Sequence, residues 1–119
     1  MRSFEDFDSW KRSHAVVLQV YSLTRSFPDN EKFGLTSQLR RAAVSIAANI
    51  AEGCKRGSRL DFAKFVVTAR ASAAEVEYLV LLSCELGFIE RSVALELREE
   101  LDHIQRMLTA LWKSLNVAR

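Results

Sequence analysis

Residues 35–53, LTSQLRRAAVSIAANIAEG, are typical of a helix with small or apolar residues on two opposite sides. Alanine has the highest helix propensity of any residue, and no proline lies in the segment. At about 100° per residue, one side carries the larger aliphatic residues, which we predict to face the core. This core side consists of Leu35, Leu39, Ala42, Ala43, Ile46 and Ile50. The opposite side holds Ser37, Val44, Ala48 and Ala51.

The second side is the stronger constraint, because a helix that is apolar on two sides is usually buried on two sides. A small bundle formed by one chain covers only one of them. We therefore predict that the side around Val44 and Ala48 meets another subunit. The alternative is that the alanines only serve helix propensity.

A line of polar residues runs between these two sides at spacings of three or four. Its members are Gln38, Arg41, Ser45, Asn49 and Glu52. One interpretation is a ligand site. The other is a hydrogen-bond network that fixes the register of assembly or the choice of partner, as single buried polar residues do in coiled coils.

The remaining sequence predicts three further helices. The first spans about residues 9–26 and ends before Pro28, which forbids its continuation. The third starts at the S-x-x-D signal of Ser58 and Asp61 and stops at Gly87, and Ser92 is expected to cap the fourth. One proline and four glycines in 119 residues leave little room for a many-stranded β fold.

Each of these helices has an apolar stripe that we assign to the core. In the first helix the expected stripe is Phe7, Trp10, His14, Val17 and Tyr21. In the third it is Phe62, Phe65, Val66, Ala69, Ala73, Val76 and Val80. In the fourth it is Leu97, Leu101, Ile104, Leu108, Leu111 and Leu115. Because the connections are short, we predict one domain over residues 1–119, an antiparallel up-down four-helix bundle.

Composition places the chain among globular proteins, since 49% of its residues are hydrophobic and 27% are charged. No uncharged run approaches the roughly 20 residues of a membrane span. The start, MRSFEDFDSW, lacks the apolar core of a signal peptide, so a cytoplasmic location is expected. Cys54 and Cys84 are not expected to form a disulfide.

Catalytic and metal-binding patterns are weak. Glu100 and His103 form an E-x-x-H, but di-iron bundles need this motif twice, and Lys11 stands where a second copy at His14 would need its glutamate. The segment GCKRGSR lacks the spacing of a phosphate-binding loop. Cys54 stands beside two cations that would favour its thiolate, without a histidine or acid to complete a catalytic set. We therefore predict no enzyme, no metal and no cofactor.

The charge is unevenly distributed along the chain. Residues 35–70 hold seven cations and two acids, a net charge of +5, whereas the other 83 residues carry −3. Phosphates are the common partner of such a patch, and the free N–H groups at a helix start also favour anions. The candidate nucleic-acid-binding residues are Arg40, Lys55, Arg56, Arg59 and Lys64. The alternative is an ordinary solvated surface with ion pairs between subunits.

Several blocks of the sequence resemble the four-helix-bundle family of 23S ribosomal-RNA intervening-sequence proteins. The matching elements are Phe27, Pro28, Glu31, residues 34–42, residues 45–53 and residues 69–75, which include the fairly specific N-I-A-E-G block. One departure is Ala71, where the family usually has glycine. The resemblance implies a bundle that assembles as a ring, a homopentamer, and it transfers no catalytic residues.

A sister group resembles the accessory protein of diversity-generating retroelements, a basic ring that partners a reverse transcriptase and its nucleic acid. Three hypotheses follow for this chain. The first is a non-catalytic oligomer that binds structured RNA through phosphates. The second is a protein–protein adaptor that recruits a reverse transcriptase, and the third is a purely structural oligomer.

Overall fold

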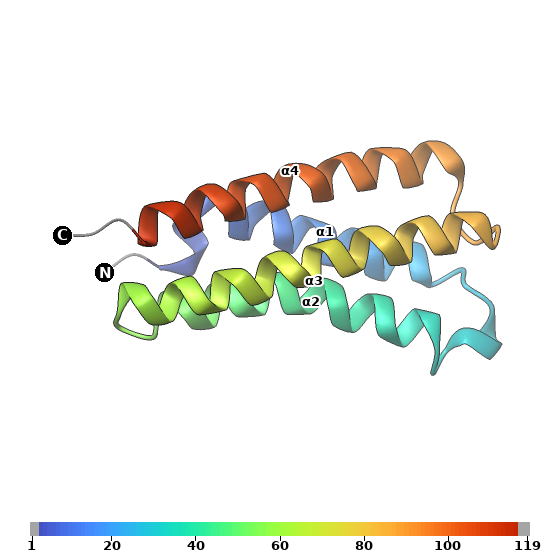
Figure 1. Cartoon of the computed structure of the whole chain (residues 1–119). Coiled ribbons are helices and arrows are strands. Elements are labelled where there is room, and N and C mark those ends of the chain that lie inside the picture. The colour runs from blue at the N-terminus through green and yellow to red at the C-terminus, as the bar shows by residue number, and fades with distance from the viewer. Residues whose placement is uncertain (1–2, 117–119) are drawn as a thin grey trace.

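The computed structural model describes residues 3–116, and this part of the chain is all-α. Its four long helices are α1 (Asp8–Thr24), α2 (Leu35–Cys54), α3 (Arg59–Glu85) and α4 (Arg91–Leu115). Two short 3-10 helices, η1 (Phe4–Asp6) and η2 (Asp29–Glu31), precede α1 and α2. The molecule is elongated, with extents of 50 × 23 × 19 Å (Figure 1).

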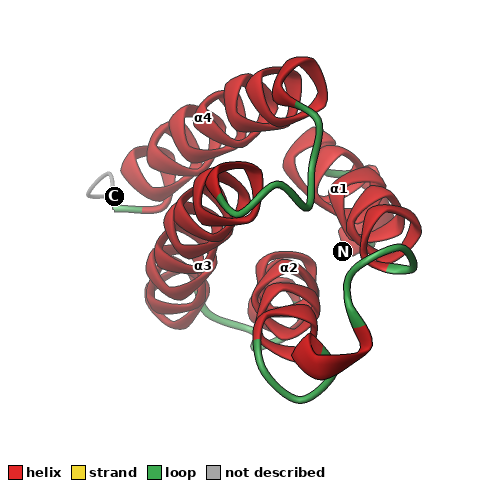
Figure 2. Cartoon of the chain, turned by 90° about the vertical axis from the view of Figure 1, so that its right-hand side faces the viewer, coloured by secondary structure: helices red, strands yellow, loops and turns green. Residues whose placement is uncertain are grey.

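Consecutive helices run in opposite directions and pack on one another in chain order (Figures 1 and 2). α2 contacts both α1 and α3, α3 also packs along α4, and the contact between α1 and α4 is the smallest. We call the end with the α2–α3 turn the proximal end. The end with the α1–α2 and α3–α4 connections is the distal end (Figure 1). These findings confirm the all-α fold and the sequential packing of four helices.

The core contains the predicted faces of α2, α3 and α4 with few exceptions. All six residues of the predicted core side of α2 are buried. In α3 only Phe65 of the predicted stripe is half-buried, and in α4 Leu111 and Leu115 are half-buried at the proximal end. The spacing of large aliphatic residues therefore predicted most of the core correctly, because the burial of these side chains stabilises the fold more than any other contribution.

The predicted core stripe of α1 is wrong by one position. The residues that α1 buries are Ser9, Ser13, Val16, Val20 and Thr24. His14 and Tyr21 are exposed, and Phe7, Trp10 and Val17 lie half-buried at the rim of the core. Two of the buried hydroxyl groups donate within the helix, Ser13 to the carbonyl of Ser9 at 2.6 Å and Thr24 to that of Val20 at 2.8 Å.

Two of the three predicted helix signals are confirmed. The Ser58 hydroxyl accepts a hydrogen bond from the Asp61 N–H at 3.0 Å, and Gly87 takes a φ of 84° after the end of α3. The prediction that Ser92 caps α4 is wrong, because α4 begins at Arg91 with Glu90 as its cap residue. Ser92 lies in the first turn, where its hydroxyl donates to the Glu90 carboxylate at 3.0 Å.

Gly53 lies inside α2 and is buried against α3. A Cβ atom at this position would lie 2.6 Å from the Cβ of Phe65 and 2.9 Å from a ring carbon of Phe62. The glycine therefore lets the ends of α2 and α3 approach closely at the proximal end. Within residues 3–116, no helix is long and apolar enough to cross a membrane.

Candidate interaction surfaces

The outward side of α2 is left open by the chain's own helices. Val44 is 40% exposed and Ala48 is exposed, while Ser37 and Ala51 are half-buried. The core side of the same helix is buried throughout. The helix therefore presents a second, weakly polar surface that no other element of the described chain covers.

α3 has an outward stripe of the same kind, which the sequence analysis missed. The stripe alternates in steps of four and three residues, as an inner face does, and all its members are exposed. Its members are Leu60, Lys64, Val67, Ala71, Ala74 and Tyr78. Leu60 is 64% exposed and Tyr78 is 59% exposed. Only Lys64 in this stripe is charged, so two neighbouring helices both expose sides with few charges.

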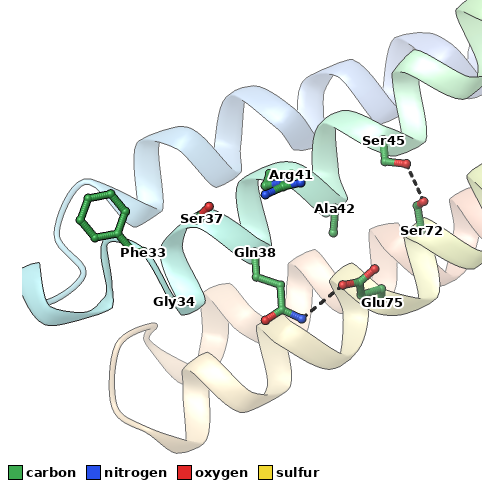
Figure 3. Close-up of a pocket in the computed structure, with 9 residues that line it drawn as sticks. All are labelled: Phe33, Gly34, Ser37, Gln38, Arg41, Ala42, Ser45, Ser72 and Glu75. Atoms are coloured by element: carbon green, nitrogen blue, oxygen red, sulfur yellow. Dashed lines mark hydrogen bonds between the residues drawn. The ribbon is translucent and has the colours of Figure 1, made fainter.

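The polar line of α2 lies where α2 meets α3. Gln38 donates to the Glu75 carboxylate at 3.4 Å, and the hydroxyls of Ser45 and Ser72 lie 2.8 Å apart (Figure 3). Asn49 donates to the Ser45 carbonyl at 2.7 Å. Gln38 and Ser45 thereby link α2 to α3 within one chain, whereas the Asn49 bond lies within α2.

The other two members of the line are exposed: Glu52 lies 3.7 Å from Arg56, and Arg41 lines an open groove at the distal half of this junction. The groove has a volume of about 470 Å³, and its floor includes Ala42, Ser45 and Ser72. Phe33 stands at the groove's end, with its ring apart from the other labelled side chains (Figure 3). At 91% exposure it is the most exposed large hydrophobic residue of the described chain.

The α2–α3 turn brings four of the five predicted nucleic-acid-binding residues to the proximal end. Lys55 lies with its Nζ 5.9 Å from the ring centroid of Phe4, and the Arg56 guanidinium lies 5.1 Å from that of Phe65. Arg59 donates to the backbone carbonyl of Ser114 at the end of α4. These three cations and Lys64 are all exposed, although Arg56 also lies 3.7 Å from the Glu52 carboxylate.

Arg40 does not join this group. It lies fifteen residues before Lys55 on α2, which is about 22 Å along the helix axis. Its Nε donates to the Thr24 hydroxyl at 2.8 Å, and its guanidinium stacks 4.6 Å from the centroid of the Tyr21 ring. The side chain therefore connects α2 to α1, a contact that charge counting along the sequence does not reveal.

The E-x-x-H motif of α4 is used for packing. Arg12 of α1 donates two hydrogen bonds of 2.8 Å to the Glu100 carboxylate, which joins α1 to α4. These hydrogen bonds hold the pKa of Glu100 below its usual range. His103 is exposed. Among residues 3–116, no three histidine, cysteine, aspartate or glutamate side chains cluster where they could hold a metal ion.

A family model described as "23S rRNA-intervening sequence protein" matches residues 5–110. The chain belongs to this family. Its membership confirms the resemblance carried by the F-P-x-x-E and N-I-A-E-G blocks.

A solved structure agrees with this assignment. The chain is similar to a protein of unknown function from the S23 ribosomal protein family of Bacteroides thetaiotaomicron, with a TM-score of 0.80 and 25% sequence identity. The similarity covers 88% of this chain and 95% of the other. No curated protein sequence matches the chain. Neither of the two descriptions names a catalytic activity.

Proposed function

We propose that this member of the 23S rRNA-intervening sequence protein family is a non-catalytic protein that assembles with copies of itself and binds structured RNA through phosphate contacts. The observation that carries the proposal is that weakly charged helix sides and a cluster of cations occupy separate parts of the exposed surface. Sides of α2 and α3 with few charges lie open along the bundle, and a cluster of exposed cations occupies the turn that joins them.

Self-assembly is supported by the exposed hydrophobic residues on the outward sides of α2 and α3. Soluble monomers rarely expose contiguous apolar patches of more than a few hundred Å². Val44 on α2 and Leu60, Val67 and Tyr78 on α3 are each at least 40% exposed, and both helices also carry exposed alanines on these sides. Removal of apolar surface from water stabilises a complex by about 25 cal/mol per Å². A second copy of the chain is a partner that is always present at matching concentration.

RNA binding is supported by the chemistry of the turn. Lys55, Arg56, Arg59 and Lys64 lie within ten residues, at the start of α3, where backbone N–H groups favour anions. In a closed ring, symmetry would repeat this cluster on every subunit, so individually weak phosphate contacts would add through avidity. Phosphate contacts carry no base information, so the expected target is defined by shape and charge.

The test measures retention of structured RNA as a function of salt. The wild-type protein should bind at about 50 mM salt, lose affinity steeply as salt rises, and show little sequence preference. A double variant, Arg56→Glu with Arg59→Glu, should bind more weakly and with a flatter salt dependence, because fewer counterions are released.

A matched control makes the same change of charge away from the turn, with Arg25→Glu and Arg106→Glu, two exposed positions on other parts of the bundle. Its binding should stay near that of the wild type. Circular dichroism and light scattering establish that helix content and oligomer size are unchanged in both. Equal losses in the two double variants would show that only total charge matters. No retention by the wild type would remove the RNA function and favour the adaptor hypothesis.

A further inference from the structure

Phe33 and Arg41, at the distal half of α2, contribute little to the packing of the bundle. Phe33 is 91% exposed on the connection that leads into α2, although burial of an aromatic ring stabilises a fold. Arg41 is exposed, and no hydrogen bond or ion pair engages its guanidinium within residues 3–116. Both line the groove of about 470 Å³ between α2 and α3 (Figure 3). The two side chains therefore offer an aromatic face and a positive charge to a ligand.

A second groove reaches Phe33 from the side of α1. It has a volume of about 290 Å³, and its lining includes Tyr21, Lys32 and Arg40. Phe33 and Arg41 line both grooves, so the two grooves share an edge at these side chains. Lys32 lies beside the ring, with its Nζ 5.5 Å from the centroid of Phe33. The aromatic ring thus stands between two hollows, with cations next to it.

The charged groups of the two grooves are mostly positive. Their linings contain three cations, Lys32, Arg40 and Arg41, and one acid, Glu75, which accepts a hydrogen bond from Gln38 at 3.4 Å. An apolar partner surface would bury cations without a counter-charge, which is costly, whereas an anionic partner is complementary. The surface therefore fits a ligand that brings negative charge together with a group that packs on Phe33.

An unpaired nucleotide brings both. Stacking of bases on aromatic side chains, with phosphates held by lysine and arginine, is how proteins bind single-stranded nucleic acids. Ser37 and Gln38 in the same groove add donors and acceptors for a base edge or for the ribose 2′-hydroxyl. A base inside a duplex is already stacked between its neighbours, so it has no free face for Phe33. The chemistry of the grooves therefore favours an unpaired segment over a duplex.

This surface lies apart from the cations of the α2–α3 turn. The 20 residues of α2 span about 30 Å, and they separate Phe33 at the distal end from Lys55 at the proximal end (Figure 1). One nucleotide cannot reach both places. An RNA with a folded part and an unpaired segment is large enough to contact the turn with its phosphates and Phe33 with a base.

We propose that Phe33 is a stacking platform for an unpaired base of RNA, with Lys32 and Arg41 holding the adjacent phosphates; this inference rests on the RNA binding proposed above and adds a second contact to it. Every base has a face that stacks, so the contact tolerates any sequence. It makes the target a structured RNA that also carries an unpaired segment.

The experiment compares two RNA probes built on one hairpin. One is blunt, and the other carries a single-stranded tail of about eight nucleotides, within the range of known single-strand sites. Phe33→Ala should weaken binding of the tailed probe about ten-fold and leave binding of the blunt probe unchanged. Phe33→Tyr keeps an aromatic ring and should bind like the wild type. Leu18→Ala, at another exposed hydrophobic position, should change neither affinity.

A tail of abasic nucleotides separates stacking from phosphate contacts. It keeps every phosphate and removes the bases, so the wild type should bind it about as weakly as Phe33→Ala binds the normal tail. Phe33→Ala should lose nothing further on the abasic tail, because both changes remove the same interaction. Arg41→Gln should instead flatten the salt dependence for the tailed probe, since fewer counterions are released. Phe33→Ala should leave that dependence unchanged.

The outcomes separate this inference from the RNA binding at the turn. If the wild type retains both probes and Phe33→Ala binds the tailed probe equally well, the stacking contact is wrong and the binding at the turn stands. If the wild type retains neither probe, both are wrong. A changed oligomer size of Phe33→Ala in light scattering would assign the ring to a contact between copies. An acidic peptide whose binding depends on Phe33 as strongly as that of the tail would assign the surface to a protein partner.

Discussion

α2 and α4 differ in what they present to solvent, although both bury an apolar side. The inner side of α4 holds Leu97, Leu101, Ile104 and Leu108, all fully buried. Its exposed positions are mostly charged or polar, among them Glu96, Glu99, Asp102, His103 and Arg106. The outward side of α2, by contrast, exposes the apolar residues Val44 and Ala48. α4 has the pattern of a surface helix, and α2 has the pattern of a helix that lies between two layers.

The difference separates the surface that the fold of one chain buries from the surface that the proposed assembly would bury. A charged outer side gains nothing from burial, because removing charges from water is costly unless they are paired. A side of small and aliphatic residues gains from every contact that excludes water. The same chain can therefore be stable as a bundle and still leave α2 and α3 with surface to bury.

The largest effect expected from this comparison is on assembly. Ala48→Glu places a charge at the centre of the outward side of α2, and an unpaired buried charge costs about 3–5 kcal/mol. Light scattering should show the wild type at several times the 13.5 kDa chain mass and the variant shifted towards monomer. Ala110→Glu makes the same change at an exposed position of α4 and should leave the mass unchanged. Equal behaviour of the two variants would remove the distinction between α2 and α4.

A smaller effect is expected on the inner side of α2. Gly53→Ala gains about 1 kcal/mol from helix propensity if nothing opposes it. The new Cβ would lie 2.6 Å from the Cβ of Phe65, which belongs to a helix backbone that cannot easily move. Overpacking of this kind costs about 1–3 kcal/mol, so the net effect should be a lower free energy of unfolding. Chemical denaturation measures it, and a stabilised variant would show that α2 and α3 have room to separate.

The sequence predicted those parts of the structure that large aliphatic residues determine. The inner sides of α2 and α4 follow from leucines and isoleucines at helical spacing, since burial of these side chains dominates the free energy of folding. The inner side of α1 could not be found in this way. It contains Ser9, Ser13 and Thr24, and a buried serine that bonds to its own helix is indistinguishable in sequence from an exposed one.

The candidate surfaces were predicted unevenly for a related reason. The outward side of α2 was visible because its alanines stand opposite a clear core side. The outward stripe of α3 was missed, because α3 is apolar around much of its circumference and periodicity then marks no single side. Arg40 was grouped with the turn by charge alone, although its contacts with Thr24 and Tyr21 place it between α1 and α2. Contacts between helices depend on register, which one sequence does not contain.

The smallest effect concerns the contact between α1 and α4, the weakest helix pair of the bundle. Arg12 lowers the pKa of Glu100 below its usual value of 4.5 through hydrogen bonds to the carboxylate. The folded state therefore binds this proton less readily than the unfolded state, so the pair stabilises the fold above about pH 4.5 and ceases to do so as the pH falls through the lowered pKa.

Glu100→Gln should accordingly lower the melting temperature slightly at neutral pH, and the difference from the wild type should disappear in acid. The effect is small because both side chains are partly exposed, and exposed ion pairs contribute little. Glu99→Gln, at an exposed neighbouring position on α4, controls for the loss of one negative charge. If Glu100→Gln and Glu99→Gln give the same difference at every pH, the Arg12 contact contributes nothing specific. The charged residues of α4 that meet α1 would then contribute no more to stability than its exposed charged residues. The contrast with the weakly charged outward side of α2 would be sharper still.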